Sequence, residues 1–255
     1  MTVFWCAVPR DVIQVSGPDA LTYLHSQVSN DLRPMQVGQS CWSFLLEPTG
    51  KVDVLLRVTR TADETFVLDT DAGSGEVMTT RVNRFKIRVK ADVQPLEWST
   101  VAVRSTTGAH VGEVAPADGS FAVIGWGGGY DLLGPSPLAP EGIDRGSDAL
   151  LDAARVEAGW PAMGSEIVPA ETVPAETGIT SIAVSFTKGC YPGQELVERM
   201  DSRGATAPRL LQVVDVADGT VPGTPLMRDG AEIGTITSVA GTRALAYVKR
   251  SALAG

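Results

Sequence analysis

The sequence predicts a mixed α+β protein that ends in a small β-rich module. Strand-like alternation and helix-like spacing follow one another along the first part of the chain. A Gly/Pro-rich stretch from 125 to 142 reads as a long connection, and short strand patterns separated by Pro/Gly turns fill the C-terminal part. With 255 residues, 44% of them hydrophobic, the chain can bury the core of one large domain or of two to three small ones.

The first half begins with a strand and an amphipathic helix. Alternation over 11–15 predicts the strand, and Leu21, Leu24 and Val28 lie at helical spacing within the stretch 19–31. A weakly helical stretch is expected at 71–85. The further strand patterns cover 41–46, 51–60, 65–69, 86–93, 98–104 and 121–124.

The second half contains a capped helix, an irregular stretch and the β-rich module. Ser147 can cap a helix that extends to Glu157, and Gly159 and Pro161 terminate it. Prolines make the chain irregular from there to 177, and Pro192 can open a short helix over 193–200. The strand patterns that predict a small C-terminal β-barrel cover 209–216, 231–238 and 244–248.

Charge and cysteine usage restrict the class of function. The 30 acidic and 21 basic side chains leave a net charge of −9, which repels phosphate backbones, so no direct nucleic-acid binding is expected. The start lacks a signal-peptide pattern and no run of 18 apolar residues occurs, which predicts no membrane contact. Cys6, Cys41 and Cys190 include no CxxC pair, so we expect reduced thiols in the cytoplasm and no four-thiolate metal site.

One segment concentrates chemistry, and residues 187–195 read Thr-Lys-Gly-Cys-Tyr-Pro-Gly-Gln-Glu. At a helix start, Cys190 would feel free N–H groups and the helix dipole, and the ammonium of Lys188 favours its thiolate. We therefore predict Cys190 as the catalytic, most reactive thiol, with Lys188 supporting it. From chemistry alone, a buried structural cysteine fits equally well. A cysteine–histidine pair would need His25 or His110 folded against Cys190, which no spacing demands.

Residues 188–195, which read Lys-Gly-Cys-Tyr-x-Gly-Gln-Glu, resemble the signature of the YgfZ family. That family includes mitochondrial iron–sulfur assembly factors and is related in fold to the aminomethyltransferase of glycine cleavage. On the first helix, His25-Ser26-Gln27 stands where the family usually has Gln-Gly-Gln. The other segments similar to the family, in the same order, are 17–31, 50–52, 155–161 and 234–238.

The resemblance implies a three-part cloverleaf of the aminomethyltransferase folate-binding type, with a small C-terminal β-barrel. Its central hole would hold tetrahydrofolate or a derivative. Residues 1–40 and 146–205 would form a discontinuous folate-binding subdomain. Residues 41–145 would form a second α+β subdomain, and 206–255 the barrel.

The resemblance also implies which residues bind the folate. Glu157 matches the glutamate that hydrogen-bonds the pteridine ring in the related transferases, and a carboxylate suits the N–H donors of an aminopyrimidine edge. Cys190 is expected near the mouth of the same cavity. Trp160 could stack on the ring. The residues assigned to the cofactor together with Glu157 are Arg155, Trp160, Gln194 and Glu195.

The function that the resemblance implies is support for the assembly or repair of iron–sulfur enzymes, tRNA-modifying ones included, through Cys190. The expected partners are folate and iron–sulfur client or assembly proteins. With one motif cysteine, the chain by itself cannot supply four thiolates to a cluster. Two alternatives stay open: a folate-dependent one-carbon (aminomethyl) transferase, and a non-enzymatic interaction scaffold whose cavity is vestigial.

Overall fold

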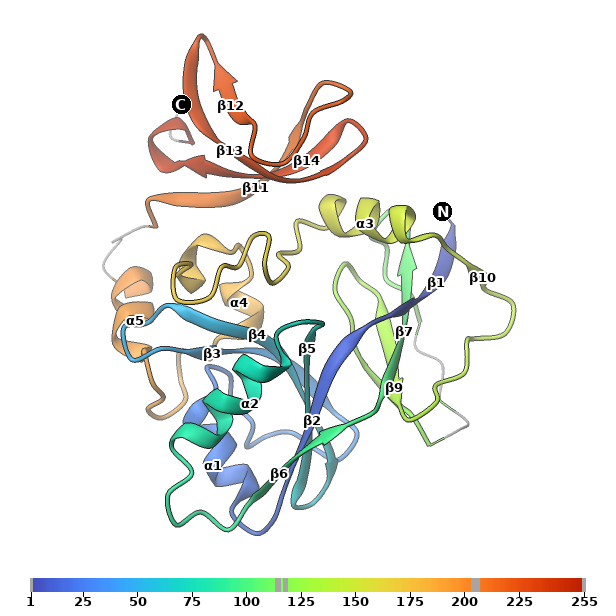
Figure 1. Cartoon of the computed structure of the whole chain (residues 1–255), viewed down its shortest axis with the longest axis vertical. Coiled ribbons are helices and arrows are strands. Elements are labelled where there is room, and N and C mark those ends of the chain that lie inside the picture. The colour runs from blue at the N-terminus through green and yellow to red at the C-terminus, as the bar shows by residue number, and fades with distance from the viewer. Residues whose placement is uncertain (1, 113–115, 117–118, 203–206, 254–255) are drawn as a thin grey trace.

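The computed structural model describes residues 2–112, 116, 119–202 and 207–253, and within them the strands form three β-sheets (Figure 1). Two five-stranded sheets make up the body of the molecule, and a four-stranded C-terminal sheet lies at one end. Helix α3 (Asp148–Glu157) contacts the C-terminal sheet on one side and the sheet of the N-terminal strand on the other. The predicted α+β class is confirmed.

One five-stranded sheet is antiparallel throughout and is covered by two helices. Its strands, in spatial order, are β3 (Ser40–Leu46), β4 (Val52–Ala62), β5 (Thr65–Asp71), β2 (Arg10–Ser16) and β6 (Asp92–Leu96). The helices are α1 (Ala20–Gln27) and α2 (Gly75–Arg84). Leu24 of α1 and Met78 of α2 have no solvent exposure and join Leu56 and Phe66 of the sheet in one hydrophobic core. Apolar burial of this kind is what stabilises the helices on the sheet.

The second five-stranded sheet is joined to the first at two chain crossings. Its strands, in spatial order, are β10 (Asp144–Arg145), β1 (Val3–Val8), β7 (Ser99–Ser105), β9 (Tyr130–Gly134) and β8 (Phe121–Ile124). The chain passes from β1 into β2 at Pro9, which has no N–H to donate to a ladder. It returns at Glu97 and Trp98, between β6 and β7. The two sheets are thus linked covalently at both crossings.

The C-terminal sheet packs on α3. Its strands, in spatial order, are β11 (Arg209–Asp215), β14 (Arg243–Lys249), β13 (Ala231–Ala240) and β12 (Pro225–Arg228), and the short helix η2 (Arg250–Ala252) follows. Val156 of α3 is buried against Leu211, Leu245 and Tyr247. The predicted β-rich C-terminal module is confirmed.

The segment between α3 and the C-terminal sheet is irregular, as its prolines predict. Ser147 caps α3, because its Oγ accepts a hydrogen bond of 3.2 Å from the amide of Leu150. The helix after Pro192 begins at Gln194. The short helices of this segment are η1 (Pro174–Glu176), α4 (Thr180–Ala183) and α5 (Gln194–Ser202).

The sheets divide the chain at other points than the boundaries predicted at 40 and 145. Helix α1, predicted to belong with 146–205, packs on strands from 40–71, whereas β1 pairs with β7 in the other sheet. The physical reason is that strand pairing follows the ladder between β2 and β5, which joins segments far apart in the sequence. The boundary predicted at 205–206 lies outside the described residues.

A buried chain of charges joins the two five-stranded sheets. Arg57 on β4 donates two hydrogen bonds of 2.9 Å to Asp69 on β5 and one of 2.6 Å to Asp131 on β9. Arg104 on β7 donates to the second oxygen of Asp131 at 2.6 Å. These side chains are at most 7% exposed. Burial favours the neutral form of Asp131, but the charges of Arg104 and Arg57 outweigh it and lower the pKa of this carboxyl.

Asp131→Asn should destabilise the protein by about 3–5 kcal/mol, because the buried guanidinium groups of Arg57 and Arg104 both lose the negative charge that they share. The measurement is the free energy of unfolding from urea denaturation at pH 7. Asp63→Asn is the control, since that side chain is 94% exposed, and it should change the free energy by at most about 0.5 kcal/mol. Equal effects of the two substitutions would contradict the assigned role of Asp131.

Candidate functional site

A cavity of about 250 Å³ lies where the two five-stranded sheets meet α3. Arg10 comes from the crossing between the sheets, Trp42 from β3, and Arg104 and Asp131 from β7 and β9. Helix α3 and the chain after it complete the wall with Arg155, Asp152 and Trp160, and Trp126 follows β8. Segments from across the chain therefore share one central cavity.

Three tryptophans and three arginines line this cavity, and two of the arginines lie over tryptophan rings. The ring centroids of Trp42 and Trp160 lie 4.8 Å apart, with the ring planes tilted by 55°. The guanidinium of Arg10 lies 5.7 Å from the Trp42 ring, and that of Arg104 lies 4.1 Å from the Trp126 ring. Cations over ring faces hold the aromatic walls in place. Planar aromatic surface of this kind suits a flat ring ligand.

The cavity wall also carries hydrogen-bond donors that no described residue uses. Trp42 Nε1 and Arg104 Nε are buried, and neither has a partner among the described residues. An unpartnered buried donor costs about 1–3 kcal/mol. Both residues line the cavity, so these unpartnered donors lie beside it.

Asp152 supplies an exposed carboxylate at the same cavity. No cation among the described residues lies within ion-pair distance of it. Leu151, Asp152 and Arg155 all line the cavity, which is the spacing of one helix face. The sequence analysis did not select Asp152, although its position three residues before Arg155 is a signal that helical periodicity provides.

Arg155 and Trp160, both predicted to bind the cofactor, lie together at the cavity. Arg155 Nη1 donates to the carbonyl oxygen of Trp160 at 2.9 Å and to Glu166 at 3.0 Å, and Nη2 donates to Ser238 on β13 at 2.8 Å. Glu166 has no solvent exposure. Arg155 therefore holds α3, the following loop and the C-terminal sheet together at the edge of the cavity.

Glu157 lies outside this cavity. Two residues further along a helix a side chain is rotated by about 200°, so Glu157 points away from the face that Arg155 occupies. Its exposed carboxylate accepts a hydrogen bond of 2.9 Å from Arg243 on β14 and lines a separate hollow with Gly127 and Gly128. The resemblance implied that Glu157 lies in the same cavity as Arg155 and Trp160. The structure places it outside that cavity.

The loop of Lys188 and Cys190 docks on the C-terminal end of α1. The Lys188 ammonium, 7% exposed, donates to the carbonyl oxygens of His25 and Val28 and to that of Asn30 at 3.1 Å. Burial lowers the pKa of Lys188 to about 8, although Asp31 opposes this. The lysine predicted to activate the thiol is thus engaged with backbone carbonyls and anchors the loop. The first helix and this loop are brought together, as predicted.

Cys190 is exposed and lies four residues before α5, rather than at the helix start. It lines a pocket of about 410 Å³ against α1 and has no place in the wall of the central cavity. Gln194 donates to Glu198 within α5, and Glu195 is exposed. Neither Gln194 nor Glu195 lines the central cavity. The predicted site residues therefore lie apart. Arg155 and Trp160 line the central cavity, Cys190 lines the pocket at α1, and Glu157 lines a separate hollow.

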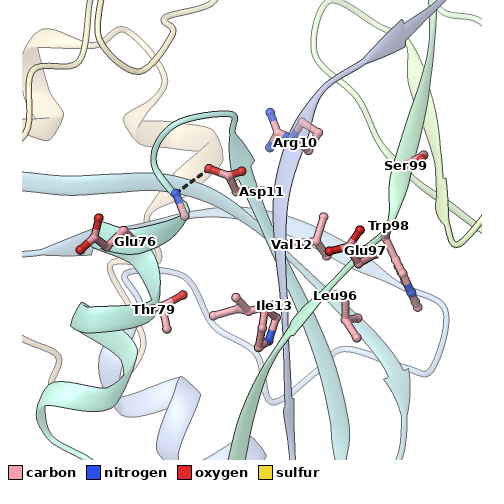
Figure 2. A pocket seen from close by; sticks show the side chains of 12 residues that line it. Arg10, Asp11, Val12, Ile13, Glu76, Thr79, Leu96, Glu97, Trp98 and Ser99 are labelled. Atoms are coloured by element: carbon pink, nitrogen blue, oxygen red, sulfur yellow. Dashed lines mark hydrogen bonds between the residues drawn. The ribbon is translucent and has the colours of Figure 1, made fainter.

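A further hollow, of about 500 Å³, lies between β2, the start of α2 and the crossing from β6 to β7 (Figure 2). Its carboxylates are Asp11, Glu76 and Glu97. Asp11 is already engaged, because its Oδ2 accepts hydrogen bonds from the amides of Gly73 and Gly75 at 2.8 and 2.7 Å and so caps α2. The dashed line in Figure 2 marks the second of these bonds. No helix within the described ranges is long and apolar enough to cross a membrane.

Comparisons with known proteins support the fold. The family model of the CAF17 C-terminal beta-barrel domain matches residues 209–255. The solved structure of the glycine cleavage system aminomethyltransferase T from Bartonella henselae superposes with a TM-score of 0.75, at 20% identity, over 98% of this chain and 79% of that one. The chain therefore has an aminomethyltransferase-like fold.

Sequence relatives define the family. The chain is 30% identical over 267 residues to an aminomethyltransferase of Parafrankia sp., covering 88% of this chain and 70% of that protein. It is 26% identical to the "Iron-sulfur cluster assembly factor IBA57 homolog, mitochondrial" of Neurospora crassa, over 85% of this chain and 54% of that protein. The chain belongs to the aminomethyltransferase family and is homologous to these assembly factors. The chain spans about half the length of the fungal assembly factors that it matches.

The wild-type free energy of unfolding should rise relative to that of Lys188→Met between about pH 8 and 10.5. The folded chain releases the proton of Lys188 near pH 8, below the ordinary value of 10.5. The unfolded chain therefore binds more protons in this window, and stability increases with pH, by about 1–3 kcal/mol in total. Urea denaturation at several pH values measures the effect.

Lys249→Met is the matched control for this experiment, because it removes an ammonium that is 52% exposed. The control should show no comparable rise against wild type. Parallel curves for wild type and Lys188→Met across the window would contradict a buried ammonium at this position.

Proposed function

We propose that this protein is a tetrahydrofolate-binding auxiliary factor of the YgfZ type, which supports the assembly or repair of iron–sulfur enzymes through Cys190. Relatives named iron–sulfur cluster assembly factors support the cellular role. The observation that carries the ligand proposal is the central cavity, with its tryptophan walls and its unused N–H donors. Three free cysteines favour a reducing compartment, which we take to be the cytoplasm.

The cavity residues fit the pteridine ring of a reduced folate. Trp42 and Trp160 offer faces for the flat ring, and the unpartnered Nε–H groups of Trp42 and Arg104 would donate to its carbonyl oxygen. Asp152 would accept from the aminopyrimidine N–H donors. A volume of about 250 Å³ is below the roughly 300–1,000 Å³ of drug-sized sites, so the ring end would be enclosed and the glutamyl tail would lie outside.

The central cavity and the pocket of Cys190 are separate, so the proposed function has to assign a role to each. When bound, tetrahydrofolate supplies one-carbon carrier chemistry at the nitrogens of its ring system. Cys190 lines a different pocket, so its thiol would not act on the enclosed ring. An exposed thiol is instead accessible to a partner protein or to a small molecule. We therefore assign folate binding and thiol chemistry to separate faces of one factor.

A second candidate function is folate-dependent aminomethyl transfer, because the chain is 30% identical to an aminomethyltransferase over 88% of its length. The two candidates differ in their product. Purified protein supplied with tetrahydrofolate and an aminomethyl donor would form methylenetetrahydrofolate only if it is a transferase. Folate binding without this product favours the auxiliary factor.

Asp152→Asn should weaken tetrahydrofolate binding by roughly tenfold or more, because a charged acceptor is lost. Isothermal calorimetry under reducing, anaerobic conditions measures the affinity. Glu157→Gln is the matched control on the same helix, and it should leave the affinity unchanged, since Glu157 faces Arg243 outside the cavity. If Glu157→Gln weakens binding and Asp152→Asn does not, the proposed pose is wrong.

Cys190→Ser should lower the activity of iron–sulfur enzymes in a cell that depends on this protein, while tetrahydrofolate affinity stays within about twofold. The reason is that the thiol pocket and the central cavity share no lining residue. The measurements are enzyme activity in extracts and calorimetry on the purified variant. Cys6→Ala, which removes a thiol that is 2% exposed, is the control. Full enzyme activity with Cys190→Ser would refute a role for this thiol.

A further inference from the structure

The pocket in front of Cys190 is formed by one face of α1 and the loop that Lys188 anchors. In Figure 1 the chain preceding α5 runs down beside α1. Leu21, Thr22 and His25 come from α1, and Arg33 follows it. The pocket of about 410 Å³ is large enough for a small organic molecule, but it holds a thiol, a guanidinium and an imidazole rather than aromatic walls.

Arg33 gives the pocket a positive charge in a protein of net charge −9. Its side chain is exposed, and its guanidinium has no ion-pair partner among the residues described. The neighbouring carboxylate of Asp31 is turned toward His25, with its Oδ1 3.3 Å from Nδ1. The charge of Arg33 is therefore available to an anion that enters beside Cys190.

His25 provides a second feature that points to a ligand. It lines the pocket, is 5% exposed, and its Nε2 has no hydrogen-bond partner within the described part of the chain. The amide of Leu32 donates to its Nδ1 at 3.4 Å, which assigns the ring proton to Nε2. Burial lowers the pKa of His25, and the nearby cations of Lys188 and Arg33 act in the same direction, whereas the carboxylate of Asp31 opposes them; the lowered pKa favours the neutral ring. Nε2–H is thus a buried donor in need of an acceptor.

We propose that this pocket binds small disulfides that carry a carboxylate, and that Cys190 is reversibly S-thiolated there. The carboxylate is held by the guanidinium of Arg33 and by Nε2–H of His25, which places the sulfur of the ligand against Cys190. The inference rests on Cys190 as the working thiol of the proposed function. It needs no folate, since the pocket and the central cavity share no residue.

The exchange step balances without a further reactant. The thiolate of Cys190 attacks one sulfur of the disulfide, a new S–S bond forms, and the original S–S bond breaks. The other half leaves as a thiolate and takes a proton from water. The small disulfide is the oxidant, and a small thiol reverses the step. Cys41 does not compete, because burial raises the pKa of its thiol to about 12.

The test compares three small disulfides that differ in charge: dithiodiglycolate, 2-hydroxyethyl disulfide and cystamine. Intact-protein mass spectrometry follows the rate of adduct formation on wild type and on Arg33→Met. The ratio of the two rates for each probe cancels the probes' own leaving-group differences. We expect the wild-type rate divided by the Arg33→Met rate to be about five for the anionic probe, near one for the neutral probe and below one for the cationic probe.

Two further variants complete the experiment. Arg145→Met removes an exposed guanidinium on β10 of the other sheet, and it should give a ratio near one for every probe. His25→Phe should slow only the reaction of the anionic probe, with folding checked by thermal denaturation. Equal ratios for all probes with Arg33→Met, or adducts on Cys6 or Cys41, would overturn the proposal. Cluster-enzyme activity is not measured, so this proposal can fail while the proposed function stands.

Discussion

The buried ion pair between Arg57 on β4 and Asp131 on β9 joins the two five-stranded sheets, and Arg104 on β7 pairs with the same carboxylate. The walls of the central cavity depend on this contact. The guanidinium of Arg57 lies 5.2 Å from the ring of Trp42, and that of Arg104 lies 4.1 Å from the ring of Trp126. Replacing a buried ion pair by apolar groups often preserves stability. We infer that the use of these charges is positional, because they fix aromatic rings on both sides of the cavity.

Lys188 donates hydrogen bonds to carbonyl groups at the C-terminal end of α1. The last carbonyl groups of a helix have no partner within the helix, and a cation there also interacts favourably with the helix dipole. Lys188 reaches across 160 residues of sequence to the carbonyl of Val28 and also binds that of His25. Sequence chemistry assigned this lysine to the thiol, but the free carbonyls are the stronger attraction for an ammonium that the fold buries. The loop that carries Cys190 is held in place as a result.

Local patterns in the sequence predicted most of the elements, because alternation, helical spacing and the cap at Ser147 are properties of short segments. The site needed information that short segments do not carry. The resemblance selected Glu157, but the rotation along α3 turns Asp152 rather than Glu157 toward the cavity. Nothing in the sequence distinguishes Trp42 from the other aromatic residues. Only the pairing of β3 with β4 brings it to the cavity. His25 joins Cys190 only because Lys188 docks the loop on α1.

Strand β3 connects the central cavity to the loop of Cys190 through hydrogen bonds. Trp42 lines the central cavity with its ring, and its carbonyl oxygen accepts a hydrogen bond of 2.9 Å from the side chain of Asn30. The carbonyl of Asn30 in turn accepts from Lys188, two residues before Cys190. A ligand that displaced Trp42 would therefore act on the thiol loop through two hydrogen bonds rather than through a shared cavity. The central cavity and the thiol pocket share no lining residue, but these two hydrogen bonds connect their walls.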